Sequence, residues 1–254
     1  MASSSHIDIG SQNQENFEEF YVKWKKKQDN QLQELVTASK TAQPLPIDAI
    51  LCGLIHRVIA HYEDYYQVKS KWVQDNVLLI LSPQWRSPLE NAFLWIGGWR
   101  PTTAFQLLHS VSGDLGDLSS GQMNLMDNLQ RSTTLEERKW TEKMAKQEQK
   151  VADAELVELS HEVSESIRIQ GRVCDSTDVE ERVDSTLKPK KEGLEMILLR
   201  ADDLRLRTLK SVIEILSPIQ AVHFLIAVAE LQLRVHDWGK HKEQKQASGS
   251  ASNN

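Results

Sequence analysis

The sequence predicts an all-α protein, folded as an antiparallel bundle of about six to eight helices. Its 254 residues contain only 11 Gly and 7 Pro, which is about 7 % against the roughly 12 % of average proteins. An all-β sandwich or barrel is disfavoured, because it would need a turn about every 8–12 residues. Long stretches also repeat apolar residues three and four positions apart, the spacing of one helix face. Both observations favour helices throughout the chain.

The first predicted helix covers residues 16–40, after a polar tail at residues 1–15 that we expect to be disordered. Its stripe at helical spacing comprises Phe17, Phe20, Tyr21, Trp24, Gln28, Leu32, Leu35 and Val36. A segment with two prolines follows and is typical of a linker. The next helix carries the stripe Ile47, Leu51, Leu54, Val58, Tyr62, Tyr65, Lys69 and Trp72. Lys69 is the one charged residue of that stripe.

Shorter helices are predicted in the middle of the chain. The string SPLE at residues 87–90 is a helix start signal, with a serine N-cap, a proline at the first helical position and a glutamate that completes a capping box. The helix over residues 88–96 is expected to end at Gly97-Gly98. Pro101 then begins another helix.

The second half of the chain is also predicted to be helical. Residues 118–172 are highly charged and indicate a long, solvated helix or a helical hairpin, and residues 173–191 are expected to form a flexible acidic insertion. The helix predicted after this insertion carries a stripe at helical spacing that comprises Leu194, Leu198, Ala201, Arg205, Thr208, Val212 and Leu216. Ser217-Pro218 repeats the start signal, and Gly239 is expected to end the last helix. We therefore expect one helical domain over residues 16–239, followed by a disordered basic and polar tail at residues 240–254.

Composition excludes several classes of protein. The net charge is -6 and the isoelectric point about 5.8, whereas a dedicated nucleic-acid binder usually has a value above about 9. Two distant cysteines, Cys52 and Cys174, argue for a reduced, intracellular setting and against a disulfide framework or a zinc site. The sequence has neither a secretory signal nor an apolar run of the roughly 20 residues that a membrane span needs.

No motif for phosphate binding, hydrolysis, metal binding or dinucleotide binding is present. Cys52 and His56 lie four residues apart on one helix, but a small buried cysteine beside a boundary histidine is the simpler interpretation of that spacing. We therefore expect a protein that is not an enzyme, with no catalytic residue and no metal site.

Two features leave functional alternatives open. His236 lies on the apolar stripe of the last helix, where it could interact favourably with the helix dipole or act as an axial ligand to haem. Basic clusters at Lys23–Lys27 and Arg234–Lys245 could be solvated faces, or could contact phosphates or an acidic partner.

Four segments of the chain resemble one known family, the Delay of Germination domain of plants. This domain occurs in seed-dormancy regulators and in the C-terminal part of TGA-type bZIP transcription factors. The resemblance runs in order over about residues 16–239, and the string LWIGGWRP is its most specific part. The matching segments are HYEDYYQVKSKW (61–72), SPQWRSPLENAFLWIGGWRPTTAFQLL (82–108), LSSGQMNLMDNLQ (118–130) and ADDLRLRTLKSVIEILSPIQAVHFLIAVAELQLRVHDWG (201–239).

The resemblance implies a non-enzymatic regulator of seed dormancy and abscisic-acid response that influences transcription. Members act through protein partners, among them protein phosphatases of the abscisic-acid pathway, and lie in the nucleus or cytoplasm. The sequence has no basic region followed by a leucine zipper, so direct DNA contact is the alternative rather than the expectation. Association of the chain with a second copy of itself is a further interaction that we expect. Haem binding is ascribed to paired histidines of the last helix, but here His236 is preceded one turn earlier by Gln232.

Tryptophan is unusually frequent, and four of the seven lie within residues 72–99. Large rigid rings around a Gly-Gly break indicate either a packed helix junction or a surface that binds a partner. The candidate partner-binding residues are Trp85, Trp95, Trp99 and Arg100.

Overall fold

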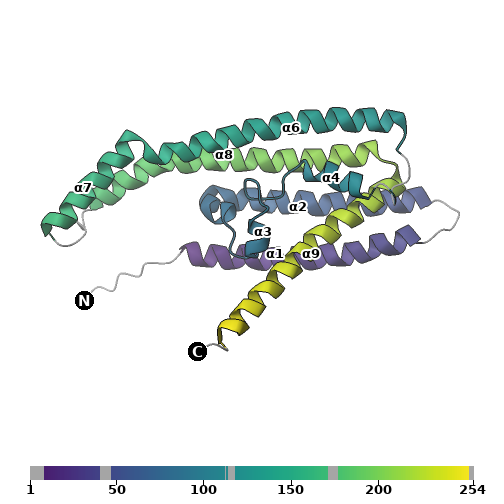
Figure 1. Cartoon of the computed structure of the whole chain (residues 1–254), viewed down its shortest axis with the longest axis horizontal. Coiled ribbons are helices and arrows are strands. Elements are labelled where there is room, and N and C mark those ends of the chain that lie inside the picture. Colours follow the sequence, from purple (N-terminus) through teal and green to yellow (C-terminus); the bar gives the residue numbers. More distant parts are fainter. Residues whose placement is uncertain (1–8, 41–46, 112, 114–117, 171–176, 252–254) are drawn as a thin grey trace.

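A computed structural model describes residues 9–40, 47–111, 113, 118–170 and 177–251. Within these ranges the chain forms eight α-helices and one short 3-10 helix, and its only β-type pairing is an isolated bridge (Figure 1). The α-helices are α1 (Ile9–Lys40), α2 (Ile47–Leu81), α3 (Pro88–Asn91), α4 (Thr103–Ser110), α6 (Ser120–Gln149), α7 (Ala154–Gln170), α8 (Thr177–Ile215) and α9 (Pro218–Ala251). The predicted all-α bundle is confirmed.

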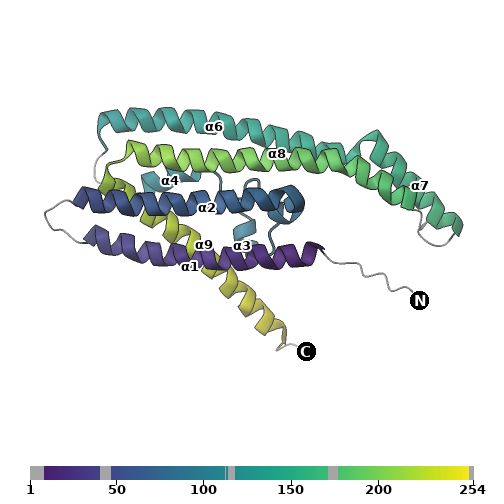
Figure 2. The same cartoon turned by 180° about the vertical axis from the view of Figure 1, so that it is seen from behind.

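Four long helices form the body of the molecule. Helices α1 and α2 run antiparallel, α8 packs on α2, and α9 crosses α1 and α2 diagonally (Figures 1 and 2). Helix α6 lies along α8 on the side away from α1. The short helices α3 and α4 lie where α9 crosses the body.

The core consists of the predicted apolar stripes. Phe17, Trp24 and Leu35 of α1 are buried, as are Leu51 and Val58 of α2, because their three- and four-residue spacing aligns them on one helix face. Aromatic rings fill the middle of this core, and neighbouring rings meet at stacked, tilted or edge-on angles: Phe17, Phe20, Tyr21, Trp24, Tyr62, Tyr65, Trp72 and Trp85. The stripes therefore predicted the inward faces of both helices.

Two of the predicted helix starts are present as capping boxes, whereas the helix expected to begin at Pro101 begins at Thr103. The Ser87 hydroxyl accepts a hydrogen bond from the backbone of Glu90, whose carboxylate accepts one from the backbone N–H of Ser87. Ser217 and Gln220 make the same exchange at the start of α9. Helix α3 ends at Asn91 rather than continuing to residue 96, and residues 92–100 form a loop whose positive φ angles lie at Ile96 and Gly97.

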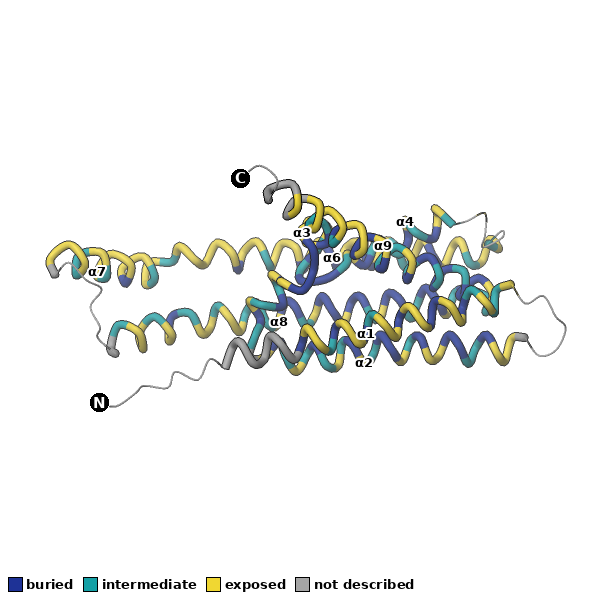
Figure 3. Tube along the Cα trace, turned by 90° about the horizontal axis from the view of Figure 1, so that it is seen from below, coloured by how far each residue is buried: buried dark blue, intermediate teal, exposed yellow. Residues whose placement is uncertain are grey.

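A two-helix arm extends beyond the body. It consists of the end of α6, a 3-10 turn at Lys150–Ala152, α7 and the first part of α8, and most of its surface is exposed (Figure 3). Of the two alternatives predicted for residues 118–172, the structure has the long helix, interrupted by the 3-10 turn, and both of its parts pack on α8 rather than on each other. Residues 177–191 are helical, which corrects the predicted flexible insertion, while residues 171–176 lie outside the described ranges. Ion pairs of Arg182 with Glu162 and of Lys190 with Asp153 join the two helices of the arm.

The ends of the chain differ from the prediction. Residues 9–15 belong to α1, and residues 1–8 and 252–254 lie outside the described ranges. Gly239 does not end α9, which continues to Ala251 through a run rich in Lys, Gln, Glu and Ala, all good helix formers. The glycine has another purpose: a Cβ there would lie 1.9 Å from the Ser87 hydroxyl. It lets α9 pass close to the start of α3. None of the described helices is both long and apolar enough to span a membrane.

Candidate functional site

The loop between α3 and α4 has an unusual, closely defined shape. Trp95 and Gly98 exchange two backbone hydrogen bonds of 2.7 and 3.3 Å, and between them Ile96 and Gly97 have positive φ angles of 45° and 67°. A side chain at Gly97 would meet Leu198 at 2.8 Å, and one at Gly98 would meet the Arg205 guanidinium at 2.8 Å. Gly97 is therefore required both for the turn and for close packing on α8, and Gly98 for close packing alone.

Arg205 of α8 fixes this loop from inside the molecule. Its guanidinium donates hydrogen bonds to the carbonyls of Trp95, of Ile96 at 2.8 Å and of Trp99 at 2.6 Å, and its plane lies over the Trp95 ring. It also pairs with Asp202 one turn earlier on α8. A planar group with five donors suits this task, because several carbonyls can be bound in one fixed geometry.

Lys69 of α2 completes the inner support of the loop. Its ammonium group, only 2 % exposed, donates to the Gly97 carbonyl at 3.0 Å and to the Asp202 carboxylate at 2.9 Å. Burial lowers the pKa of Lys69 to about 8, although the charge of Asp202 acts in the opposite direction. Asp202 thus bridges two cations through one oxygen, while its Oδ2 has no hydrogen-bond partner among the described residues.

A second buried polar cluster lies at the crossing of α3 and α9. The Glu90 carboxylate contacts His236 Nδ1 at 2.7 Å and accepts hydrogen bonds from Ser87. Burial alone would raise the pKa of Glu90, but its bonds to His236 and Ser87 and the charge of Arg86 outweigh burial, so the pKa lies below its usual value. This cluster ties the last helix to the helix that precedes the loop.

Arg86 is the least satisfied of the buried cations. Its side chain is buried, its Nη2 donates to the Tyr65 hydroxyl at 3.4 Å, and its guanidinium lies 5.4 Å from the centre of the Tyr21 ring. Nη1 has no hydrogen-bond partner among the described residues. Arg86 lines a cavity of about 40 Å³ together with Lys69, Arg205 and the half-buried Lys25.

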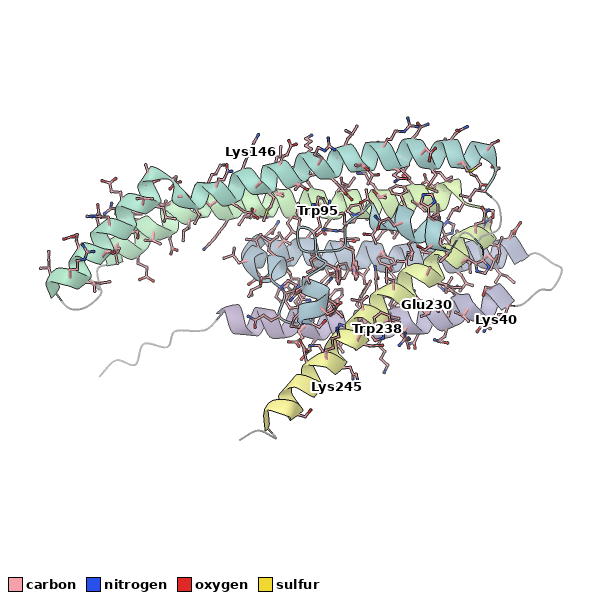
Figure 4. The ribbon with its side chains drawn as sticks, in the orientation of Figure 1. Lys40, Trp95, Lys146, Glu230, Trp238 and Lys245 are labelled. Atoms are coloured by element: carbon pink, nitrogen blue, oxygen red, sulfur yellow. The ribbon has the colours of Figure 1, made fainter. Side chains whose placement is uncertain are left out.

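The predicted partner-binding residues are divided between core and surface. Trp85 is buried against Phe17, and Trp95 is buried with its indole N–H bonded to Thr141 of α6 at 2.8 Å. Trp95 lies in the middle of the molecule, between the loop and α8 (Figure 4). Trp99 is half-buried. Arg100 is half exposed and forms an ion pair with Glu137 of α6 at 3.5 Å.

His236 is held through one of its two ring nitrogens. Its Nδ1 contacts the buried Glu90 carboxylate at 2.7 Å, and its ring lies edge-on to that of Tyr21. Gln232, one turn earlier, accepts hydrogen bonds from Gln28 at 2.6 Å and from the Tyr62 hydroxyl at 3.0 Å. Gln232 therefore does not supply the second histidine of a pair, and the role of His236 as a haem ligand stays a prediction. Among the described residues there is also no cluster of three or more His, Cys, Asp or Glu that could hold a metal ion.

The two basic clusters adjoin each other. The charges of Asp237 and Lys240 on α9 act on Lys25 of α1, and burial is the main cause of the lowered pKa of Lys25. Acidic side chains are interleaved with these bases, since Arg234 pairs with Asp237 and Lys240 pairs with Glu243. The face formed by α1 and α9 is therefore of mixed charge.

Sequence reasoning missed several residues of the site. Lys69 and Arg205 occupy positions on apolar stripes, and a charge at such a position is a signal for a buried, paired group. Asp202 and Arg86 lie off those stripes and gave no comparable signal. Phe93, which is 61 % exposed in the loop, was also missed, because periodicity does not extend into irregular segments.

Comparison with known proteins gives a consistent set of matches. A family profile described as "DOG1: Seed dormancy control" matches residues 28–110. Protein DOG1-like 4 of Arabidopsis thaliana is 29 % identical over 233 residues, which cover 90 % of this chain and 94 % of that protein. Protein RESPONSE TO ABA AND SALT 1 of Arabidopsis thaliana is 29 % identical, with coverage of 73 % and 77 %. Transcription factor TGA5 of Arabidopsis thaliana is 28 % identical, with coverage of 86 % and 62 %.

Proposed function

Because the chain carries a domain of the DOG1 seed dormancy control family, we propose that it is a non-enzymatic plant regulator of dormancy and abscisic-acid response. It acts in the nucleus or cytoplasm by binding other proteins, and through them it influences transcription. The similarity to a protein named for its response to abscisic acid and salt, and to a transcription factor, supports this assignment. Protein phosphatases of the abscisic-acid pathway are the proposed partners.

One observation carries the binding proposal: the loop of residues 92–100 is fixed from inside and displays large side chains outside. Arg205 and Lys69 bind its carbonyls, while Phe93 and Arg100 are exposed and Trp99 is half-buried. Aromatic and arginine side chains dominate the binding energy of protein interfaces. A surface that is already ordered also loses little conformational entropy when a partner binds. This loop is therefore the proposed recognition surface.

The test is affinity capture with the full-length protein. The wild-type chain and a Phe93→Ser variant are immobilised and compared for retention of purified abscisic-acid-pathway phosphatases and of proteins from imbibed seed extract. We expect the variant to lose at least about tenfold in affinity for the retained phosphatase, because an exposed aromatic anchor is removed.

Leu135→Ser is the matched control. Leu135 is 65 % exposed on α6, so its replacement removes a similar apolar surface from a different part of the molecule and should leave binding unchanged. Failure of the wild-type chain to retain any phosphatase would overturn the proposed partners. Equal retention by the Phe93→Ser variant would overturn the loop as the recognition surface.

The adjoining basic clusters on α1 and α9 favour a second candidate, direct contact with DNA. Binding through lysine and arginine to phosphates must weaken steeply as salt concentration rises. A mobility-shift titration with duplex DNA over a series of salt concentrations tests it, with Lys26→Gln/Lys27→Gln as the variant. Absence of a shift at low salt would eliminate direct DNA contact.

A further inference from the structure

We propose that the cavity lined by Arg86, Lys69, Arg205 and Lys25 is a binding site for a small carboxylate anion. This inference does not depend on the proposed partner-binding surface. It begins from Arg86, a buried guanidinium that forms no ion pair within 4.0 Å with any described carboxylate. Its polar contacts among the described residues are one long hydrogen bond to the Tyr65 hydroxyl and the face of the Tyr21 ring. An unpaired buried charge is costly, and native proteins normally pair it.

The charges around the cavity leave one positive charge in excess. Lys69, Arg86 and Arg205 are buried cations, and Asp202 and Glu90 are the buried carboxylates beside them. Asp202 is shared by Lys69 and Arg205, and Glu90 is bound by His236 and Ser87. Neither carboxylate forms an ion pair with Arg86 within 4.0 Å, so the excess charge stays at Arg86, and a single monoanion would neutralise it.

The shape of the cavity suits an ion of a few heavy atoms. Its volume is about 40 Å³, several times the roughly 10–15 Å³ of the same measure that one water molecule needs. The planar fork of Arg86 matches a carboxylate group, which it can bind through two parallel N–H donors. Nη1 is such a free donor. Lys25 is half-buried, forms no described ion pair and lines the same cavity, so its flexible ammonium group can reach an anion from the rim.

The orphaned oxygen of Asp202 adds a requirement on the ligand. Asp202 also lines the cavity, and its Oδ2 lacks a donor. A hydroxyl group beside the carboxylate would supply that donor, so a hydroxy acid such as glycolate should bind more tightly than acetate. Inorganic phosphate, which shares the oxyanion chemistry without the planar carboxylate, distinguishes a carboxylate site from a general phosphate site.

The test is a titration of the full-length, ¹⁵N-tryptophan-labelled protein with glycolate, acetate and phosphate at constant ionic strength. The indole N–H signals of Trp24 and Trp99, which line the cavity, should shift and saturate with glycolate. The signals of Trp140 on α6 and the exposed Trp238 should stay in place. Affinities in the millimolar range are expected, because a ligand with so few atoms can supply only limited binding energy.

Variants identify the site. Arg86→Met keeps the length of the side chain and removes the charge, and it should weaken glycolate binding by about tenfold or more. Lys25→Gln at the rim should weaken it several-fold without disturbing the core, so it provides the test even if the Arg86 variant fails to fold. Lys26→Gln, an exposed neighbour, is the control and should bind as the wild type does.

Three results would overturn the proposal. One is the absence of any saturable shift with the three anions, which would mean that only water fills the cavity. Another is glycolate binding that is unchanged both in the Lys25→Gln variant and in a folded Arg86→Met variant. That result would place the anion elsewhere. Tighter binding of phosphate than of glycolate would overturn the carboxylate assignment.

Discussion

Gly239 shows how one residue can be selected by packing rather than by backbone conformation. It lies inside α9, and the position of its missing side chain is taken up by Ser87, the N-cap of α3. We predict that Gly239→Ala destabilises the protein by at least about 2 kcal/mol, because the added methyl group must displace that cap. Chemical denaturation measures the change.

Gly53 is the control for this prediction. It lies in α2 with no atom within 4 Å of the position of an added Cβ. Gly53→Ala should therefore stabilise the protein by about 0.5–1 kcal/mol, the usual gain of alanine over glycine in a helix. If Gly239→Ala were stabilising too, the close approach of α9 to α3 would be wrong.

His61 is a second residue with a measurable signature. It is buried, stacks on the Trp24 ring and bonds to the Trp24 carbonyl at 3.1 Å. Burial, aided by the charge of Lys27, lowers its pKa to about 4, although the Trp24 bond and Asp64 act in the opposite direction. The ordinary pKa in an unfolded chain is about 6.5. Between these two values the unfolded chain binds a proton that the folded protein does not, so stability falls as the pH decreases from 6.5 to 4.

We predict that His61→Gln removes this part of the pH dependence. Between pH 6.5 and 4, the free energy of unfolding should fall about 2 kcal/mol less in the variant than in the wild type, after allowance for screening by solvent. Denaturant titrations at a series of pH values measure it. The exposed His56→Gln is the control and should follow the wild-type curve.

At the scale of elements, α8 determines the conformation of a loop that is distant in the sequence. The Trp95–Gly98 pair is the backbone pairing at the centre of the loop, and the carbonyls of Ile96, Gly97 and Trp99 accept hydrogen bonds from Arg205 and Lys69. A lysine keeps the charge beside Asp202 but cannot bind several carbonyls at once. We predict that Arg205→Lys destabilises the protein by about 2–4 kcal/mol and exposes the loop to proteolysis.

Arg207→Lys is the matched control, because Arg207 lies on the same helix and forms exposed ion pairs with Asp203 and Glu136. Exposed pairs contribute little, so its cost should stay below about 1 kcal/mol. An Arg205→Lys variant as stable as the Arg207→Lys variant would show that charge alone, rather than the arginine fork, supports the loop.

The sequence predicted the regular elements far better than the site. Periodicity and serine-proline starts located the stripes of α1, α2 and α8 and the caps of α3 and α9, because these signals are local. It misplaced the end of α9, since a glycine required by a distant serine looks the same as one that ends a helix. Partners such as Lys69 and Asp202, 133 residues apart, can be identified only once the helices are placed side by side.

At the scale of the whole molecule, the body and the arm differ in their burial. Leu159 is the one buried residue among the described side chains of α7, whereas α2 and α8 are buried along much of the body (Figure 3). Pro189 lies within α8 in the arm and lacks the N–H that would continue the helical hydrogen bonds. The arm should therefore open locally without unfolding of the body.

Hydrogen exchange tests this difference. We predict that amides of α7 exchange at a lower opening free energy than those of α2, and that Pro189→Ala raises the protection of the arm by about 1–3 kcal/mol while the body is unchanged. Equal protection of α7 and α2 in the wild type would contradict an independently opening arm.

The dependence of the loop on Arg205 has a consequence for biosynthesis. Trp95 precedes Arg205 by 110 residues in the sequence. Because ribosomes add roughly 5–20 residues per second, Trp95 is synthesised about 5–20 s before Arg205. Throughout that interval the nascent chain carries Phe93, Trp95 and Trp99 without the group that orders them. The loop that Arg205 fixes in the finished protein thus takes shape late on the ribosome, and chaperones have long access to it there.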